Sequence, residues 1–414
     1  MSNKIAPLRG MKDLLPEEFK IHKHIEQIAS NVSELYGYEG FATPILESAN
    51  VFDRTLGDTS DVISKEMYSF ADKKGRAVAL RPEFTASIIR AFISNGLKQK
   101  LPLKLFSSGP VFRYDRPQEG RQRQFHQLNF EYIGAVGAYS DAETISMAAH
   151  LLSKLGLLDD VVLELNSLGC AESRANYQTA LIEYFKKYEN DLSHDSKQRL
   201  EKNPLRILDS KDEDDKKISQ NAPMIADYYT EDAAKYFDDV KSYLDTLNVK
   251  YQVNPRLARG LDYYSHTAFE FITSKLGAQG TILAGGRYDG LTKLMGESEV
   301  PAIGFAAGIE RIALMGDFTP EKKRPTVIMP IGNECFNYAI NIAKQLRDKN
   351  IITTIAPDGK IGKRMQNALN DNAQYAIFIG SEEEAKNICK LKNLDQNTEQ
   401  EIAISELANI ISIK

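Results

Sequence analysis

The sequence predicts an α+β fold: an antiparallel β-sheet with flanking helices, a helical insertion, and a small C-terminal α/β domain. A β-hairpin with a long tip spans residues 112–131, a charged helical stretch spans 171–250, and strands alternate with helices over 326–414. We therefore expect a main domain over residues 1–320, with its insertion at about 171–250. A linker at 321–325 and a second domain at 326–414 follow.

The bulk composition fits a globular protein. The 414 residues are enough for about two or three cores, and contents of 42% hydrophobic and 26% charged residues are ordinary. The three cysteines show neither metal-ligand nor disulfide spacing, which suits a reducing cytosol. We find no signal-peptide pattern and no apolar run of membrane-spanning length, so we expect a cytoplasmic protein with no membrane partner. At a net charge of −5, nucleic-acid contact would have to come from a local patch.

The first predicted elements are a helix and an extended piece. Apolar residues recur at three- and four-residue steps over residues 17–36, which indicates an amphipathic helix between Pro16 and Gly37. Residues 38–47 are extended and contain Pro44, which belongs at an edge because proline donates no hydrogen bond to a sheet.

Residues 76–95 predict a strand, a turn and a helix. Glu83 and Thr85 stand at the junction between the strand and the helix, where ligand-binding groups are common. Thr85 could equally cap the helix while Glu83 complements its dipole. The residues themselves leave both readings open.

The returning strand of the hairpin has two different faces, because successive side chains alternate along a strand. One face is expected in the core: His126, Leu128, Phe130 and Tyr132. The other carries a ring followed by amide and acidic groups, which is typical of a ligand-binding face: Phe125, Gln127, Asn129 and Glu131.

The outgoing strand and the tip of the hairpin are rich in arginine. Arg113 stands beside Asp115, and the tip adds Arg116, Arg121 and Arg123. Guanidinium groups match the geometry of phosphate better than other side chains do. The hairpin therefore offers phosphate donors, a stacking ring and a carboxylate in one unit; the alternative is a surface hairpin with solvated arginines.

A helix over residues 141–158 and a strand over 161–165 precede the charged stretch. Within that stretch, the acidic run at residues 209–217 is interpreted as a solvated loop between helices and not as a site.

Three glycine- or arginine-containing blocks follow the insertion. The first is residues 259–264 (R-G-L-D-Y-Y), before a strand at 267–272. The second, residues 280–290, is glycine-rich at a strand end and could be no more than a tight turn. In the third, residues 304–315, small residues along a strand would let a flat ligand approach the backbone, and Arg311 follows near the start of a helix.

Residues 326–414 predict strand, helix, strand, helix and strand, followed by a short hairpin and a terminal helix at 404–412. The sequence Gly359-Lys360-Ile361-Gly362 superficially matches a KH-type GxxG loop, but it joins a strand to a helix, so we discount it. The chain contains no GxGxxG, GxxxxGK[ST] or GxSxG motif, which argues against a Rossmann enzyme, a Walker ATPase and a serine hydrolase.

Together these residues resemble the class II aminoacyl-tRNA synthetases, and specifically the histidyl-tRNA synthetase family, over nearly the whole chain. Residues 40–44 resemble motif 1 of that class, 112–125 resemble motif 2, and 304–311 resemble motif 3. The histidine-specific resemblance lies in residues 259–264 and in 284–289 (A-G-G-R-Y-D).

The resemblance implies roles for individual residues in binding ATP. Arg113 should bind the α-phosphate, with Arg259 on its other side stabilising charge, so that these two are the implied catalytic residues. Arg311 should bind the γ-phosphate and Phe125 should stack on adenine, and Asp115 and Glu310 complete the implied ATP site.

The resemblance also implies which residues bind histidine. Glu83, Thr85 and Gln127 should hold the α-amino group, and Glu131 and Tyr264 should contact the imidazole, with Tyr263 beside them. Polar partners for both ring nitrogens would reject analogues that leave those partners unpaired. The full implied histidine site also includes both catalytic arginines: Glu83, Thr85, Arg113, Gln127, Glu131, Arg259, Tyr263 and Tyr264.

Three positions depart from the family pattern. Motif 2 usually carries glutamate where this chain has Asp115, and the middle glycine of motif 3 is Ala306. Ser265 and His266 follow the paired tyrosines where the family varies, and we assign His266 no role.

The implied reaction is ATP-dependent activation of L-histidine to histidyl-adenylate, with release of pyrophosphate, followed by transfer to the 3′ end of tRNA(His). The resemblance implies ATP as substrate, Mg²⁺ as cofactor and a homodimer through motif 1, and it leaves the Mg²⁺ ligands unassigned. It also makes residues 326–414 an anticodon-binding domain. Candidates for contact with the tRNA acceptor end are in the hairpin tip, where they could equally be solvated arginines: Arg116, Gln118, Arg121 and Arg123.

Two alternatives remain. One is a non-catalytic, synthetase-like regulatory subunit of ATP phosphoribosyltransferase, but such proteins generally lack the terminal domain and erode the histidine motifs. This chain has residues 325–414 and keeps Arg113, Arg259 and Arg311. The other is a class II synthetase for another amino acid, against which residues 259–264 argue.

Overall fold

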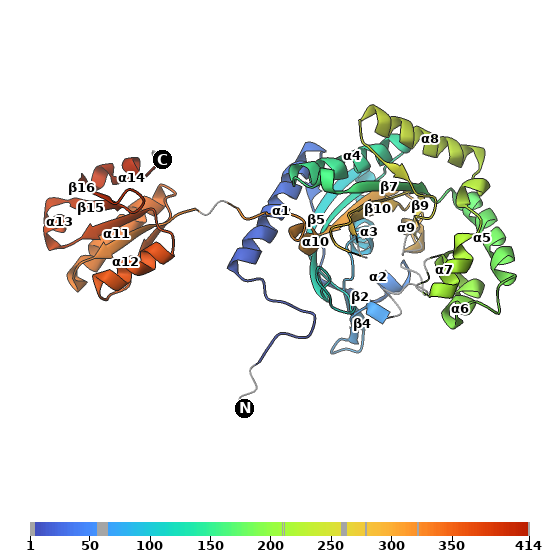
Figure 1. Ribbon diagram of the computed structural model, residues 1–414, viewed down its shortest axis with the longest axis horizontal. Helices are drawn as coiled ribbons and strands as arrows, with labels where there is room; N and C mark the ends of the chain where they lie inside the picture. Colours follow the sequence, from blue (N-terminus) through green and yellow to red (C-terminus); the bar gives the residue numbers. More distant parts are fainter. Residues whose placement is uncertain are drawn as a thin grey trace. The chain divides into compact units, whose positions relative to one another are not determined.

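The computed structural model describes residues 5–55, 65–208, 210, 212–257, 263–277, 280–320 and 323–412. The chain divides into two compact units, Met1–Pro320 and Glu321–Lys414 (Figure 1).

The first unit is built on an eight-stranded sheet in the order β1-β5-β6-β11-β10-β9-β7-β8. The six central strands pair antiparallel, and the edge strands β1 and β8 run parallel to their neighbours. The predicted antiparallel core is therefore confirmed, with parallel pairing only at its edges. The strands are β1 (Glu39–Gly40), β5 (Leu103–Phe112), β6 (Gln124–Ile133), β7 (Val162–Ser167), β8 (Gln252–Val253), β9 (Ser265–Ile272), β10 (Thr281–Arg287) and β11 (Ala302–Gly308).

The predicted hairpin is present as β5 and β6, which pair from Leu103 opposite Ile133 to Phe112 opposite Gln124. Leu128 and Phe130 are fully buried on one face of β6, as the alternation predicts. The rings of Phe130 and Phe305, on the adjacent strand β11, stack with centroids 4.4 Å apart. This packing fixes which side chains of β6 face the opposite side of the sheet.

Helices cover one face of the sheet and form its main core. Their apolar residues, such as Ile25 of α1 and Leu151 of α4, pack against the sheet residues Leu128 and Phe269. Figure 1 shows α1, α4 and α8 on this side. These helices are α1 (Pro16–Leu35), α4 (Ala138–Lys154), α8 (Glu231–Thr246) and the short α10 (Ile309–Ala313).

A second core lies on the opposite face. Here Phe84, Ile88 and Phe92, at and within α3, pack with Val111 and Ile133 of the hairpin. A small antiparallel sheet in the order β2-β4-β3 stands beside them. These elements are β2 (Leu46–Ser48), α2 (Asn50–Asp53), β3 (Ser69–Ala71), β4 (Ala77–Leu80), α3 (Thr85–Ser94) and α9 (Leu291–Leu294).

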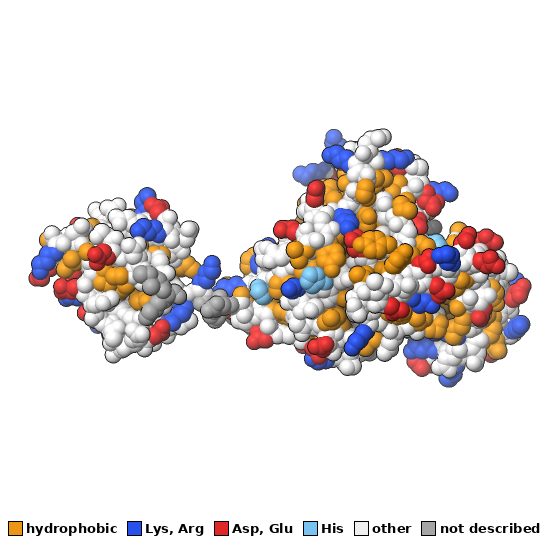
Figure 2. All heavy atoms as spheres, turned by 90° about the horizontal axis from the view of Figure 1, so that it is seen from above, with side chains coloured by type: hydrophobic (Ala, Val, Ile, Leu, Met, Phe, Trp, Pro, Cys, Tyr) orange, Lys and Arg blue, Asp and Glu red, His pale blue; other side chains and the backbone are white. Residues whose placement is uncertain are grey.

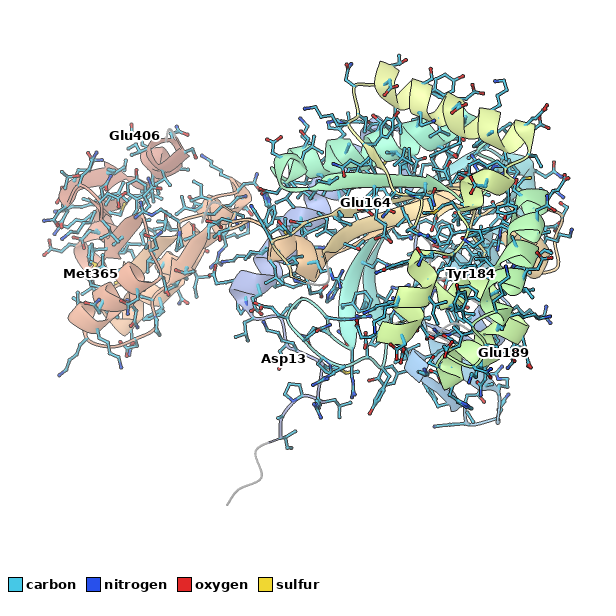
Figure 3. The ribbon with its side chains drawn as sticks, turned by 45° about the vertical axis from the view of Figure 1, so that its right-hand side comes forward. Asp13, Glu164, Tyr184, Glu189, Met365 and Glu406 are labelled. Carbon is cyan, nitrogen blue, oxygen red and sulfur yellow. The ribbon has the colours of Figure 1, made fainter. Side chains whose placement is uncertain are left out.

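The charged stretch contains a separate small core. Tyr177, Leu181 and Phe185 of α5 pack with Leu200 and Ile225, and Tyr184 lies beside them (Figure 3). Helix α8, by contrast, packs on α4 in the main core, so the small core ends before that helix. The helices of the small core are α5 (Ala171–Lys186), α6 (His194–Lys202) and α7 (Glu213–Gln220).

The prediction of a solvated loop over the acidic run is wrong for the residues that form α7. Asp212 caps this helix by accepting from the backbone amides of Asp214 and Asp215. Asp215 is fully buried, and its carboxylate accepts hydrogen bonds of 2.6 Å from Ser193, Ser196 and Ser210. A buried carboxylate held by hydroxyl donors makes this segment structural, which its charge alone did not reveal. Asp209 and Lys211 lie outside the described residues.

The second unit is a five-stranded sheet in the order β13-β12-β14-β15-β16, parallel across its first three strands and antiparallel beyond. The predicted alternation of strands and helices is confirmed, and the short helix α13 was not predicted. Two small cores hold the unit together, and Met365 of α12 packs against one of them (Figure 3). The elements are β12 (Thr326–Pro330), α11 (Phe336–Asp348), β13 (Thr353–Ile355), α12 (Ile361–Asn370), β14 (Tyr375–Ile379), α13 (Ser381–Lys386), β15 (Ile388–Asn393), β16 (Thr398–Ala403) and α14 (Ile404–Ser412).

Acidic and basic side chains are both scattered over the faces seen in Figure 2, as the small net charge predicts. Within the described residues, none of the helices is long and apolar enough to cross a bilayer.

Candidate functional site

A cavity of about 430 Å³ opens between the hairpin and strands β9, β10 and β11; we call it the hairpin cavity. Five residues predicted for ATP line it: Arg113, Asp115, Phe125, Glu310 and Arg311. The other lining residues are Gly120, Arg121, Gln122, Gln127, Glu270, Thr281, Ile282, Leu283, Ala284, Ala306 and Gly308. The hairpin thus meets the third sequence block at one cavity.

The guanidinium groups of Arg113 and Arg311 both line the hairpin cavity. The Nε of Arg113 donates to the carbonyl of Pro82 at 2.9 Å, and Nη1 of Arg311 donates to the carbonyl of Thr281. Burial and the nearby charges of Arg121 and Arg113 lower the pKa of Arg311. The positive groups repel one another, and an anion such as a polyphosphate would relieve that repulsion.

The ring of Phe125 and the small residues of β10 and β11 shape the cavity. The guanidinium carbon of Arg113 lies 5.6 Å from the centre of the Phe125 ring. Ala284 and Ala306 are paired across the two strands and line the cavity with little more than backbone. A methyl group at position 306 therefore leaves the cavity open, despite the departure from the family's glycine.

A second group of polar side chains is buried at the far end of the same strands; we call it the glutamate cluster and define it as Glu83, Thr85, Asn129, Glu131 and Tyr288. Glu131, only 1% exposed, accepts from Oγ1 of Thr85 at 2.5 Å and from Nδ2 of Asn129 at 3.0 Å. It also accepts from the hydroxyl of Tyr288. Burial raises the pKa of Glu131 to about 7 in spite of these donors.

Glu83 caps helix α3 in this cluster. Its carboxylate accepts from the backbone amides of Thr85 at 2.6 Å and Ala86 at 2.8 Å, and burial raises its pKa. The hydroxyl of Thr85 instead donates to Glu131. Of the two readings that the sequence left open, helix capping is therefore real, but it is done by Glu83 and not by Thr85.

Tyr263 and Tyr264 lie beside the glutamate cluster, with ring centroids 4.7 Å apart. The ring of Tyr263 is also 5.8 Å from that of Tyr288, and burial raises the pKa of Tyr263 well above its usual value. The phenol group of Tyr263 therefore stays protonated and can donate a hydrogen bond.

Two amide side chains connect the cavity and the cluster. Gln127 lines the hairpin cavity, and Asn129, two residues farther along β6, donates to Glu131. Their oxygens Oε1 and Oδ1 are buried and have no hydrogen-bond partner within the described residues. Acceptors of this kind are ready for a donor such as an ammonium group.

The other residues predicted for the site are Arg259 and those of the hairpin tip. Arg259 lies outside the described residues. In the hairpin tip, Gln118 and Arg121 form a bridge, and Arg121 pairs with Asp115 in the cavity. Arg123 stacks on Tyr114, with its guanidinium carbon 3.6 Å from the ring centre, and is tied to the backbone oxygen of Asp115. Arg116 is exposed at the tip.

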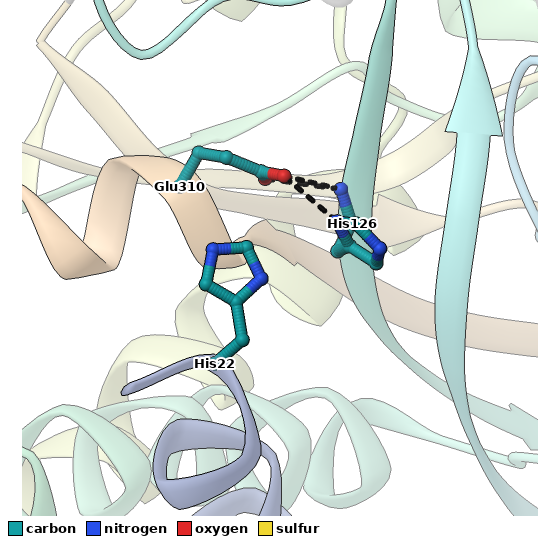
Figure 4. A group of neighbouring side chains, drawn as sticks. All are labelled: His22, His126 and Glu310. Carbon is teal, nitrogen blue, oxygen red and sulfur yellow. Dashed lines mark hydrogen bonds and ion pairs between the residues drawn. The ribbon is translucent and has the colours of Figure 1, made fainter. Parts of the chain in front are cut away.

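His126 is not a simple core residue, contrary to the prediction from alternation. Its backbone amide donates to both carboxylate oxygens of Glu310, at 2.9 and 3.0 Å, and its Nδ1 lies 2.9 Å from Oε1 of Glu310 (Figure 4). This pair connects β6 next to Phe125 with α10 next to Arg311.

Sequence reasoning missed Tyr288, Glu270 and Thr281 as members of the site. Oγ1 of Thr281 donates to Glu270 at 2.7 Å on the cavity wall. Tyr288 belongs to the glycine-rich block, where its position after Arg287 could have marked it. The sequence alone does not reveal that the block forms a central strand and not a turn.

Comparisons with known proteins indicate the same family as the sequence motifs. The family model described as Histidyl-tRNA synthetase matches residues 10–312, and the one described as Anticodon binding domain matches residues 326–414. The chain is 58% identical over 412 residues to a protein of Rickettsia bellii named Histidine--tRNA ligase, covering 99% of each chain. A Rickettsia akari protein of the same name is 59% identical over 400 residues, covering 96% of each.

Among solved structures, apo S. aureus histidyl-tRNA synthetase has a TM-score of 0.83 and 32% identity, covering 98% of this chain and 99% of that one. A Bacillus halodurans structure described as an ATP phosphoribosyltransferase regulatory subunit/histidyl-tRNA synthetase has a TM-score of 0.66 and 22% identity. The match covers 91% of this chain and 99% of that one, and it shows the fold alone.

Proposed function

The chain belongs to the histidyl-tRNA synthetase family, and we propose that the hairpin cavity and the glutamate cluster together catalyse its reaction. In that reaction L-histidine and ATP form histidyl-adenylate and pyrophosphate, and the histidyl group then passes to the 3′ end of tRNA(His). The observation that carries the proposal is that an arginine-lined cavity adjoins a buried, hydrogen-bonded carboxylate on the same strands.

In this proposal ATP occupies the hairpin cavity. Phe125 stacks on the adenine, Arg113 binds the α-phosphate and Arg311 binds the γ-phosphate. The support is that all three line one cavity, together with Asp115 and Glu310. No protein nucleophile is needed, because the histidine carboxylate attacks the α-phosphate and the arginines neutralise the developing charge.

Histidine occupies the space beside the glutamate cluster. Its ammonium group is held by Glu83, Thr85 and Gln127, whose amide oxygen has no other described partner. Glu131 accepts from one ring nitrogen of the imidazole, and Tyr264 contacts the ring with Tyr263 beside it. A carboxyl group whose pKa lies near 7 can hold the proton shared with an imidazole, since the two groups then have similar proton affinities.

Arg259 completes the catalytic pair with Arg113 in this proposal, on the strength of the family motif. It would stabilise the charge on the α-phosphate from the side opposite Arg113. If Arg259→Ala formed histidyl-adenylate at the wild-type rate, this role would be wrong.

The cavity also fits Mg²⁺, which prefers oxygen ligands and usually keeps waters and substrate phosphates. Glu270 supplies a carboxylate on the cavity wall, so this residue would hold the ion. Bound there with ATP, Mg²⁺ would add positive charge next to the phosphates.

The wider assembly is proposed from the family. The unit 1–320 is the catalytic domain and residues 326–414 bind the anticodon of tRNA(His), for which the second family model is the support. The hairpin tip, with Arg116, Gln118, Arg121 and Arg123, would contact the acceptor end. We also propose a cytoplasmic homodimer whose interface includes residues 40–44.

A ligase is favoured over the regulatory subunit, since relatives 58–59% identical over nearly the whole chain are named as ligases. The test is ATP–pyrophosphate exchange with one amino acid at a time, followed by charging of tRNA(His). Exchange with histidine alone, followed by charging, supports the proposal. Folded protein that exchanges with no amino acid would favour the regulatory subunit.

A further inference from the structure

Three potential metal ligands from distant parts of the sequence meet behind the hairpin cavity. They are His22 of α1, His126 of β6 and Glu310 of α10, shown in Figure 4. Their ligand atoms lie within 4.8 Å of one another. In the part of the chain that the structure describes, no other group of three or more histidine, cysteine or acidic side chains meets in this way.

Two of the three ligands are already oriented. The Glu310 carboxylate is fixed by the backbone amide and the Nδ1 of His126, at 2.9 to 3.0 Å. The hydrogen bonds from the backbone amide can hold the carboxylate in place during coordination, as outer-shell partners do in known metal sites. The oxygen that meets Nδ1 of His126 is therefore aimed into the cluster.

The third ligand, His22, has an unsatisfied nitrogen. Its side chain is on the core-facing side of α1, where the residue is only 8% exposed, and its ring stands edge-on to His126 with centroids 5.1 Å apart. Its Nδ1 is buried and has no hydrogen-bond partner among the described residues. An unsatisfied buried polar atom is costly, and in a native protein it calls for an unseen partner such as an ion.

We propose that His22, His126 and Glu310 bind one zinc-class divalent ion through two imidazole nitrogens and one carboxylate oxygen. This donor set is known for Zn²⁺ and other late first-row metals, whereas Mg²⁺ and Ca²⁺ take oxygen ligands. Zinc at ~2.0–2.2 Å from each ligand holds the ligand atoms about 3.4 Å apart. His22 would therefore move closer, while Nδ1 of His126 and Oε1 of Glu310, now 2.9 Å apart, would separate slightly. Water fills the fourth position.

Coordination needs no redox step and no net loss of a proton. Nδ1 of His126 gives up its hydrogen bond to Glu310 and its lone pair binds the ion, while the ring proton moves to Nε2. Nδ1 of His22 binds through the lone pair that has no described partner.

The ion would brace one wall of the hairpin cavity. His126 is adjacent to Phe125 in β6, and Glu310 is adjacent to Arg311 in α10. Tying both to α1 would fix the spacing between the ring and the arginine. The site is separate from the proposed Mg²⁺ position, which lies within the cavity beside the phosphates.

The test uses the full-length protein after dialysis against a chelator. Zn²⁺ is titrated in competition with a chromophoric chelator, and Co²⁺ is added separately to record its visible spectrum. The variants are His22→Gln, which removes the ligand nitrogen, and His24→Gln, a matched control at an exposed position two residues along the same helix.

We expect one Zn²⁺ per chain for the wild type and for His24→Gln, and at least ~100-fold weaker binding for His22→Gln. The Co²⁺ complex should lack a thiolate charge-transfer band, since no cysteine is a ligand. Equal affinity in His22→Gln, no stoichiometric binding, or a thiolate band would each overturn the proposal. If His22→Gln fails to fold, the stoichiometry and the Co²⁺ spectrum of the wild type can still overturn the proposal.

Discussion

The hairpin cavity and the glutamate cluster share strand β6 but balance their charges differently. In the cavity, the described hydrogen bonds of Arg113 and Arg311 go to neutral backbone carbonyls, and the guanidinium groups are close enough to perturb one another. In the cluster, Glu131 is surrounded by donors from Thr85, Asn129 and Tyr288 before any ligand arrives.

Under the proposed function, this difference would prepare one sheet for two unlike ligands. A polyphosphate brings its own charge, so its site can remain open and positive until it binds. The imidazole of histidine is a neutral ring with two polar nitrogens. It gives little binding energy unless the protein groups that hydrogen-bond to it are already held in place. Changes in the cavity should therefore affect catalysis, whereas changes in the cluster should also affect stability.

The largest expected effect on stability comes from a buried ion pair of Arg287, the residue before Tyr288 of the glutamate cluster. Arg287 is 2% exposed, and its guanidinium pairs with Asp141 and Asp289. Arg287→Met leaves Asp141 buried without its partner, so we expect a loss of about 3–5 kcal/mol in the free energy of unfolding. Urea denaturation measures this.

The control is the exposed pair between Arg324 and Asp395 in the second unit, at 2.6 Å. Arg324→Ala should cost only about 0–1 kcal/mol. Equal losses in the two variants would mean that burial does not set the value of the Arg287 pair.

Arg113→Ala should lower the rate of histidine-dependent ATP–pyrophosphate exchange by about 10²–10³-fold, because a donor to the transition state is lost. Its thermal stability should stay close to that of the wild type. Arg116→Ala, at the hairpin tip, is the matched control and should leave exchange nearly unchanged. A comparable fall in both variants would contradict the distinct role of Arg113.

Glu131 should make stability depend on pH. Its pKa is about 7 in the folded chain and 4.5 ordinarily, so between these values the folded state holds a proton that the unfolded state has lost. The free energy of unfolding should fall as pH rises from about 4.5 to 7, with a slope of up to about 1.4 kcal/mol per pH unit, and level off above.

In Glu131→Gln the side chain at position 131 cannot ionise, so the free energy of unfolding should depend less steeply on pH. Urea unfolding of both proteins at several pH values checks this. Glu83, whose pKa burial also raises, adds a slope of the same sign, so some dependence remains in the variant. Identical slopes in the two proteins would show that Glu131 titrates normally.

The smallest expected effect is that of Tyr288→Phe, which removes one donor to Glu131. We expect a loss of about 1–3 kcal/mol in stability at pH 8, where Glu131 is ionised. That donor lowers the pKa of Glu131, so the pKa should be higher in the variant. The free energy of unfolding of the variant should therefore level off at a higher pH than that of the wild type. A loss that is the same at pH 5 and pH 8 would mean that the hydroxyl serves packing and not the carboxylate.

Much of the fold was predictable because its patterns are local. The helix Pro16–Leu35, the hairpin of β5 and β6, and the alternation of the second unit follow from periodicity and turn residues. Arg113, Phe125 and Arg311, which line the hairpin cavity, could be named because they lie in short motifs.

The rest depended on long-range contacts. Asp215 is held by serines that include Ser193 and Ser196, about twenty positions away, which no charge pattern in α7 reveals. Tyr288 reaches Glu131 only because β10 lies next to β11, which pairs with β6. His126 falls on the predicted core face but meets Glu310, which comes from the other end of the unit.

The central claim is that the two regions bind two different ligands, and calorimetric titration of histidine and of ATP into matched variants tests it most directly. The account predicts that Glu131→Gln weakens histidine binding at least ~10-fold and leaves ATP binding unchanged, while Arg311→Ala does the reverse. If Glu131→Gln bound histidine as tightly as the wild type, the glutamate cluster would not be the site that recognises the imidazole.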